Sequence, residues 1–463
     1  MAFLLGIFAA LRLLLDMGSS SAFYTFLSQR PRSRRFIVWY LAWQALQLAL
    51  PFGLIAVCLP AEWITQIWQG ESRTLVLMAL MAAFTQGSLW QTVIQMGEAR
   101  RETVRVQLAG VGLAGVHLVA IWFLKLTGML SLSVVFALIA VEFLVASVAV
   151  GRYFVQAPAD TKEDTPTVLW RQYVAYCMPL VPYAWLGFIS EFADRWLLQN
   201  HGGAIEQAYY TVGKEFSLVA LLATGSILNI FWKEIAEAHH QGNYERMSEL
   251  YRKVSRMLYF IGAAIAGYLI PCSADMLLLL QGPAYTEGAI TVTIMFLYPL
   301  QQSLGQVGSA MLMATERISL YVRIGMYSAV ASIIATYFVL TPTDATVPGL
   351  GWGSEGLALK IVVTQAVAVN VMAWLIARIW NWRFDWHHQP ASLLLCLGVG
   401  WLAHAFVNAM LPAAETVGTL ALAGVVYSFL LAFSVYALPT LVGLTRAEVS
   451  TMAQTTLRRV IAK

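Results

Sequence analysis

The stretch LSLSVVFALIAVEFLVASVAVG (Leu130–Gly151) carries a single ionisable residue, Glu142, in a run of apolar and small residues. An α-helix needs roughly 20 mainly apolar residues to cross the hydrocarbon core of a bilayer. This stretch has the required length and composition. It therefore predicts a membrane-spanning helix.

The composition of the whole chain agrees with this interpretation. Of 463 residues, 29 are Lys or Arg and 25 are Asp or Glu, which makes 12% charged, whereas an average soluble domain has about 25%. Hydrophobic residues make up 59%, and the mean hydropathy is +0.67. These values exclude an ordinary globular enzyme, a disordered chain and a coiled coil. We therefore expect an all-α, polytopic membrane protein.

Twelve further stretches resemble the first one in length and composition, which makes thirteen in all. The connections between them are too short to hold a separate soluble domain. The expected spans are residues 1–27, 36–57, 73–96, 104–126, 130–151, 172–198, 208–232, 256–272, 288–314, 318–340, 354–377, 391–411 and 416–441.

The distribution of Lys and Arg supports this set of spans. If alternate connections face the cytoplasm, 23 of the 29 positive residues lie in cytoplasmic connections or in the tail, and only Arg73 and Lys125 lie in the opposite ones. The C-terminus is then cytoplasmic and the net charge of +4 reflects topology, with no nucleic acid implied. The N-terminus is placed outside, and no Lys or Arg precedes the first apolar run, which argues against a signal peptide.

A weak internal repeat suggests two parallel halves. The matched pairs recur 207 to about 217 residues apart: LLLDMGSSSAF (Leu13–Phe23) with LLATGSILNIF (Leu221–Phe231), Cys58 near Pro60 with Pro271-Cys272, and Met96–Arg100 with Met313–Arg317. The span 172–198 then lacks a counterpart, which would precede Met1. The chain is therefore expected to contain helices 2–14 of a fourteen-helix, two-lobe design with the first helix missing.

The expected domains follow from this register. Residues 1–157 would form the N-terminal lobe, and residues 168–380 the C-terminal lobe. The polar segment 158–167 has linker composition and would join them. Residues 381–463 would add two extra helices and a cytoplasmic tail.

Ionisable residues inside spans are costly in lipid and are functional candidates. Cations that face a cavity suit an anionic substrate such as a diphosphate. Lys214 and Lys360 lie too deep for easy snorkelling and lead the candidate substrate-binding set, which also contains Arg195 and Arg12. Candidates for coupling to an ion gradient are Glu142, Glu191, Asp194 and Glu215.

Each candidate also has a purely structural interpretation. Arg12 and Asp16 are four residues apart on one helical face and can form a local ion pair. Arg195 lies near the outer end of its span, where it can snorkel. Lys214 and Lys360 can pair with Glu191 or Glu142 simply to hold helices together, and this interpretation has about the same weight as a substrate site.

The sequence contains no motif for redox cysteine chemistry or for nucleotide binding. The four Cys residues are isolated in apolar surroundings and lack CxxC spacing, so they are interpreted as packing residues. No nucleotide-binding P-loop sequence occurs. We therefore expect no metal site, no cofactor and no covalent catalysis.

Several segments resemble bacterial polysaccharide flippases, the polysaccharide-transporter branch of the multidrug/oligosaccharidyl-lipid/polysaccharide exporter superfamily. They are DMGSSSAFYTFLSQ (Asp16–Gln29), DRWLLQNHGGAIEQAYYTVGKEFSLVALL (Asp194–Leu222), QGNYERMSELYRKVSRMLYFIG (Gln241–Gly262) and LLLQGPAYTEGA (Leu278–Ala289). Asp194 and Arg195 match the acidic–basic pair of that family, and Lys214 falls in its eighth helix.

The resemblance implies a function as well as a fold. The chain would move an undecaprenyl-diphosphate-linked oligosaccharide, such as a polysaccharide or O-antigen repeat unit of lipopolysaccharide, across the bacterial inner membrane by alternating access. Its partners would be that substrate, membrane lipids and other polysaccharide assembly proteins. The alternative is a cation-coupled multidrug antiporter of the same superfamily. An enzyme is disfavoured because no outside connection is large enough to house a reaction site.

Overall fold

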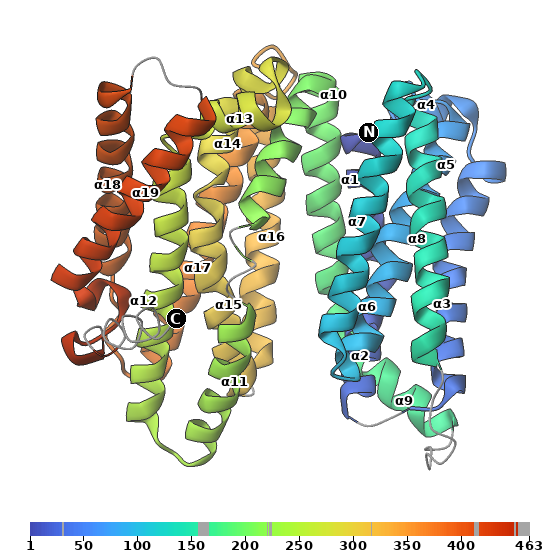
Figure 1. Cartoon of the computed structure of the whole chain (residues 1–463). Helices are drawn as coiled ribbons and strands as arrows, with labels where there is room; N and C mark the ends of the chain where they lie inside the picture. Colours follow the sequence, from blue (N-terminus) through green and yellow to red (C-terminus); the bar gives the residue numbers. More distant parts are fainter. Residues whose placement is uncertain are drawn as a thin grey trace. The chain divides into compact units, whose positions relative to one another are not determined.

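The computed structural model describes residues 1–29, 32–155, 166–219, 221, 225–315, 317–411, 416–448 and 451. Within these residues the regular structure is entirely helical (Figure 1). This confirms the expected all-α fold. The physical reason is that a backbone in lipid must satisfy its hydrogen bonds internally, which a helix does within one segment.

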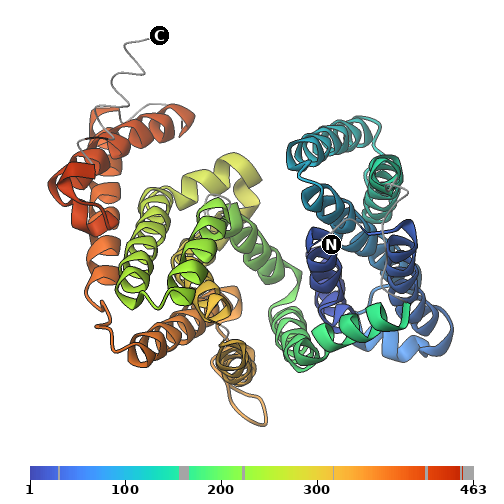
Figure 2. The same cartoon turned by 90° about the horizontal axis from the view of Figure 1, so that it is seen from below.

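The chain forms two compact units, Met1–Asn200 and His201–Lys463. Figure 2 views many helices of each unit nearly end-on. The first unit contains α1 (Ala2–Asp16), α2 (Ser19–Gln29), α3 (Arg34–Gly53), the π-helix η1 (Leu54–Cys58), α4 (Ala61–Ile67), α5 (Arg73–Phe84), the π-helix η2 (Thr85–Leu89), α6 (Trp90–Ala99), α7 (Thr103–Leu126), α8 (Leu132–Val155), α9 (Pro166–Cys177), the 3-10 helix η3 (Met178–Leu180) and the first part of α10 (Val181–Val219).

The long helix α10 continues into the second unit and is kinked at Gly203, where φ is 75°. The second unit then contains α11 (Gly225–His240), α12 (Tyr244–Leu269), α13 (Ser273–Gln281), the 3-10 helix η4 (Pro283–Gly288), α14 (Ala289–Met295), α15 (Tyr298–Ala314), α16 (Ile318–Leu340), α17 (Gly353–Ile379), α18 (His388–Met410), α19 (Thr416–Ala437) and the 3-10 helix η5 (Pro439–Val442).

In the described residues, nine helices are long and apolar enough to cross a membrane, or eleven if each of two bent helix pairs is one span. Two differences separate this count from the thirteen expected spans. The expected span 172–198 and the first part of the expected span 208–232 fall in the segment Thr167–Val219, which counts as one span although it is kinked at Gly203. The expected span 288–314 is divided into α14 and α15, each too short to count alone. The protein is a multi-pass membrane protein.

The matched sequence segments fall at corresponding places in the helix order of the two units. Leu13–Phe23 covers the break between α1 and α2, and Leu221–Phe231 includes the start of α11. Cys58 ends η1, and Cys272 lies between α12 and α13. Arg100 follows α6, and Arg317 follows α15. The repeat is therefore visible in the order of the helix breaks.

The boundary between the two units falls after Asn200, whereas the expected linker was residues 158–167. Residues 158–165 of that linker lie outside the described residues, and its last two residues begin α9. Residues 172–198 fall within the first unit.

Candidate functional site

The first unit is interrupted at membrane depth by the break between α1 and α2, which form one bent span at an angle of 63°. Met17 and Gly18 have φ values of 48° and 80°, a left-handed conformation that ends α1. The Asp16 carboxylate accepts hydrogen bonds from Ser19 Oγ at 2.9 Å, Ser20 N at 3.0 Å and Ser20 Oγ at 2.8 Å. Asp16 therefore caps the N-terminus of α2, where backbone N–H groups lack helical partners.

Arg12 does not pair with Asp16. Its Nη1 donates a hydrogen bond to the carbonyl oxygen of Gly87, in the π-helical turn η2. A Cβ at position 87 would lie 2.9 Å from Arg12 Nη1, so the guanidinium can approach because residue 87 is glycine. The expected ion pair between Arg12 and Asp16 does not form, because α1 ends at Asp16 and the Asp16 carboxylate points to the start of α2. Arg12 is exposed, and its charge is matched only by a neutral carbonyl among the described residues.

Arg195 also packs against α1. It is 7% exposed and its neighbour Asp194 is 5% exposed. A Cβ on Gly6 would lie 2.8 Å from Arg195 Nε, which places the guanidinium directly on the backbone of α1. Arg195 is thus buried within the first unit and does not snorkel to an interface. Of the candidate cations, Arg12 therefore extends from α1, and Arg195 packs against it.

Glu142 pairs with a histidine rather than with a lysine. His117 Nδ1 on α7 lies 2.7 Å from Glu142 Oε2 on α8, and the side chains are 29% and 10% exposed. His117 is nine residues from the end of α7, and Glu142 is ten residues after the start of α8. At 1.5 Å per residue, both lie about 15 Å from those helix ends, close to the middle of a bilayer about 30 Å thick. His117 and Glu142 therefore lie at the same depth in the membrane.

The remaining candidates occupy varied environments. Glu191 is half-buried on α10 in the first unit. In the second unit, Lys214 is half-buried on α10, Glu215 is exposed, and Lys360 on α17 is 5% exposed. Lys214 and Lys360 led the sequence-based ranking, but Arg12 is the one of the four cations that is exposed at membrane depth. Within the described residues, no group of three or more His, Cys, Asp or Glu side chains could hold a metal ion.

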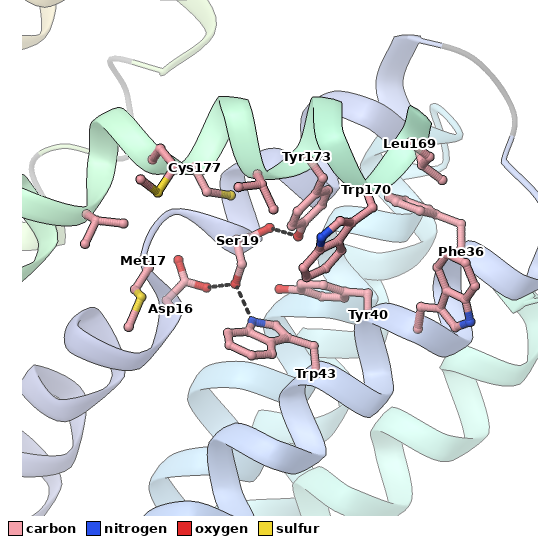
Figure 3. A pocket seen from close by; sticks show the side chains of 14 residues that line it. Asp16, Met17, Ser19, Phe36, Tyr40, Trp43, Leu169, Trp170, Tyr173 and Cys177 are labelled. Carbon is pink, nitrogen blue, oxygen red and sulfur yellow. Dashed lines mark hydrogen bonds between the residues drawn. The ribbon is translucent and has the colours of Figure 1, made fainter. Parts of the chain in front are cut away.

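A cavity of about 220 Å³ lies beside the α1–α2 break (Figure 3). Its walls come from that break, from the first turns of α3 and from α9. The sequence analysis missed it. The signal was present as the aromatic stripe Phe36, Trp39, Tyr40 and Trp43, whose spacing places four rings on one face of α3. The opposite wall on α9 is more than 120 residues away in the chain, and the sequence contains no sign of that contact.

Comparisons with known proteins identify the fold. No family model matches the chain, and no curated protein sequence matches it. The lipid II flippase MurJ in an inward closed conformation is similar, with a TM-score of 0.64 and 12% identity over 94% of this chain and 92% of that one. An inward-facing multidrug resistance MATE family transporter of the MOP superfamily is similar, with a TM-score of 0.62 and 15% identity over 82% and 88%.

A third similar structure is also a transporter of the MOP superfamily. A MOP superfamily transporter from Pyrococcus furiosus, described as having a binding pocket of reversed polarity that suggests a different function, has a TM-score of 0.54 and 14% identity over 81% of this chain and 85% of that one. The class is therefore plain: the chain is a multi-pass membrane protein with the fold of MOP superfamily transporters. These similar structures are transporters and flippases, not enzymes.

Proposed function

We propose that the chain translocates an anionic, lipid-diphosphate-linked oligosaccharide across the bacterial inner membrane by alternating access, with the C-terminus in the cytoplasm. The observation that carries the proposal is Arg12. It lies near the middle of the bent α1–α2 span, it is exposed, and a neutral carbonyl is its partner. Placing an arginine at the centre of a span costs about 2.5–3.5 kcal/mol. An anion that binds there would offset this cost.

The chemistry of arginine fits a diphosphate. Its planar guanidinium donates paired hydrogen bonds to phosphate oxygens, and its charge persists at all physiological pH values. Gly87 holds one guanidinium nitrogen in place, which leaves the other donors of Arg12 for a ligand. The fold shared with a lipid II flippase over 94% of the chain supports the lipid-linked class of substrate. Arg195, Lys214 and Lys360 complete the proposed cationic set.

The test is translocation of a fluorescent polyprenyl-diphosphate oligosaccharide in proteoliposomes. We expect Arg12→Leu to lower the initial rate by about tenfold or more, the equivalent of one lost charge-assisted contact. Arg12→Lys should retain part of the rate. Arg105→Leu is the matched control, because Arg105 is exposed at the start of α7 and pairs with Glu102.

Equal rates for wild type, Arg12→Leu and Arg105→Leu would contradict the proposal. A second variant tests the geometry separately. Gly87→Ala keeps every charge but places a methyl group 2.9 Å from Arg12 Nη1, so it should lower the rate without removing the arginine. A rate that survives both changes would exclude Arg12 from the substrate path.

The alternative is a cation-coupled multidrug antiporter. The half-buried His117–Glu142 pair favours it, because ionisable residues paired within membrane spans commonly mark ion pathways in transporters. The fold shared with MATE transporters is consistent with it. Glu191, Asp194 and Glu215 are the other proposed coupling residues. A cationic dye moved by a pH gradient at a rate unaffected by Arg12→Leu, and abolished by Glu142→Gln, would favour this function over the first.

A further inference from the structure

The cavity beside the α1–α2 break is lined by none of the four proposed substrate-binding cations. Aromatic rings dominate its walls: Phe36, Trp39, Tyr40 and Trp43 on α3, and Trp170 and Tyr173 on α9. Figure 3 shows Trp170 and Tyr173 on α9 facing Tyr40 and Trp43 on α3, with Asp16 and Ser19 beside them. Among the residues that the structure describes, its lining contains no Lys or Arg.

Most of the polar side chains of the wall make hydrogen bonds within the protein. Tyr173 Oη donates to the Ser19 carbonyl at 2.5 Å, and Trp43 Nε1 donates to Ser19 Oγ at 3.1 Å. Gln44 Nε2 donates to Tyr40 Oη at 3.3 Å, and the Asp16 carboxylate caps α2. The surface that remains consists of ring faces and aliphatic groups. An occupant would therefore be held by apolar contact rather than by hydrogen bonds.

The size of the cavity limits what can enter. Sites that enclose drug-sized ligands measure roughly 300–1,000 Å³. A cavity of about 220 Å³ is smaller than this range. It exceeds the roughly 150 Å³ that admits benzene into an apolar protein cavity. A slender hydrocarbon chain fits these limits, whereas a bulky organic cation does not.

Positive charge lies on the side of the cavity where α3 begins. Arg35 precedes Trp39 by one helical turn on α3, and Arg171 precedes Val174 by one turn on α9. Both arginines are exposed, as is Arg34. Trp39 and Trp170 are 48% and 62% exposed, as expected for rings at a membrane interface. An amphiphile with an anionic head at these arginines could place its chain in the cavity.

We propose that this cavity binds one acyl chain of an anionic bilayer phospholipid, whose headgroup is held by Arg35 and Arg171. The lipid would wedge between α3 and α9 and make van der Waals contacts with the ring faces that line the cavity. The bilayer supplies phospholipid at high concentration, so even modest affinity maintains occupancy. The site is separate from the proposed substrate cation Arg12, and it stands whether or not the chain is a flippase.

The first experiment uses the native cysteines of the wild-type chain. Cys177 lines the cavity, and Cys58 is exposed elsewhere in the same unit. In detergent, added phosphatidylglycerol should slow modification of Cys177 by N-ethylmaleimide by about tenfold, corresponding to a modest binding free energy, and leave Cys58 unchanged. Equal protection of both cysteines, or of neither, would overturn the proposal.

The second experiment counts bound lipid by native mass spectrometry at fixed phosphatidylglycerol concentration. Val174→Trp fills the cavity and should abolish the retained lipid. Val168→Trp makes the same change on the same helix at an exposed position outside the lining, and should retain it. The double variant Arg35→Gln with Arg171→Gln should weaken retention of phosphatidylglycerol but not of neutral diacylglycerol. Thermal unfolding confirms that each variant is folded.

Three results would overturn the assignment. If the Val174→Trp variant is folded and retains the same amount of phosphatidylglycerol as the Val168→Trp variant, the lipid binds elsewhere. Stronger protection of Cys177 by the cationic amphiphile benzalkonium would make the cavity a cation site that uses Asp16. Selective retention of a polyprenyl phosphate over phosphatidylglycerol would make it a tail site for an isoprenoid substrate.

Discussion

Two glycines, one in each unit, serve different purposes in the contacts that they make. In the second unit, α12 and α18 meet backbone to backbone: a Cβ on Gly400 would lie 1.8 Å from the Gly267 carbonyl oxygen. In the first unit, a Cβ on Gly87 would meet the far end of the Arg12 side chain at 2.9 Å. A backbone cannot move aside, whereas a long side chain can. The second contact holds helices together, as small residues do in membranes, and the first one positions a charge.

The ion pairs show the same division. The first unit places His117 and Glu142 at mid-span. In the second unit, the described ion pairs Arg246–Glu234, Arg256–Asp385 and Lys253–Glu448 each link α12 to a segment outside the candidate spans: α11, the connection before α18, and the segment after η5. A pair at mid-span lies in a medium of low dielectric constant, whereas a pair that involves a segment outside the spans is screened by water and salt. Charge substitutions should therefore matter more in the first unit, and steric ones more in the second.

The largest effect should come from Gly400→Ala. The added methyl group meets a backbone carbonyl, so α12 and α18 must separate, at a cost of about 3 kcal/mol in the free energy of unfolding. Gly398→Ala, on the same helix with no neighbour within 4 Å, should be neutral or slightly stabilising. Thermal unfolding in detergent measures both. Similar midpoints for the two variants would show that the contact tolerates expansion.

An intermediate effect should come from separating His117 and Glu142. His117→Leu leaves a carboxylate that is 10% exposed without its partner, at a cost of about 1–3 kcal/mol. The double variant His117→Leu with Glu142→Leu should cost less than the sum of the two single variants, because no charge is then left in the apolar region. A double-mutant cycle on unfolding measures the coupling. Additive effects would mean that the pair contributes nothing beyond its separate residues.

The smallest effect should come from the pair Lys253–Glu448, which are 2.5 Å apart and 44% and 38% exposed. Lys253 and the Thr445 backbone donate hydrogen bonds that lower the pKa of Glu448 to about 2. A carboxyl group with a depressed pKa stabilises the fold above its unfolded value, near 4.5, and loses this as the pH falls toward 2. Because the pair is exposed, we expect only about 0.2–1 kcal/mol.

The comparison is between wild type and Glu448→Gln in unfolding midpoint at pH 7, 4.5 and 2. Their difference should shrink as the pH falls and should also shrink in 1 M salt, where the screening length is about 3 Å. A difference that is constant across this range would mean that Glu448 acts through its neutral hydrogen bonds to Thr445 alone.

Some residues of the candidate site could be predicted from the sequence, but the contacts that they make could not. Arg12, Glu142 and Arg195 were recognisable because an ionisable residue in an apolar run stands out at any position. Their partners were not recognisable. The i, i+4 rule pointed Arg12 to Asp16, but it assumes a continuous helix, and α1 ends at Asp16. The true partner, Gly87, is 75 residues away and offers a backbone carbonyl that carries no sequence signal.

The sequence by itself determined that this chain is helical and crosses a membrane many times. Hydropathy suffices for that, since lipid leaves a long apolar segment almost no alternative to a helix. It also indicated a repeat whose matched segments recur in the order of the helix breaks. Only the tertiary structure decided where the units divide, which cations are exposed, and that α9 closes an aromatic cavity against α3. Those features depend on contacts between segments far apart in the chain, and such contacts follow from packing rather than from local composition.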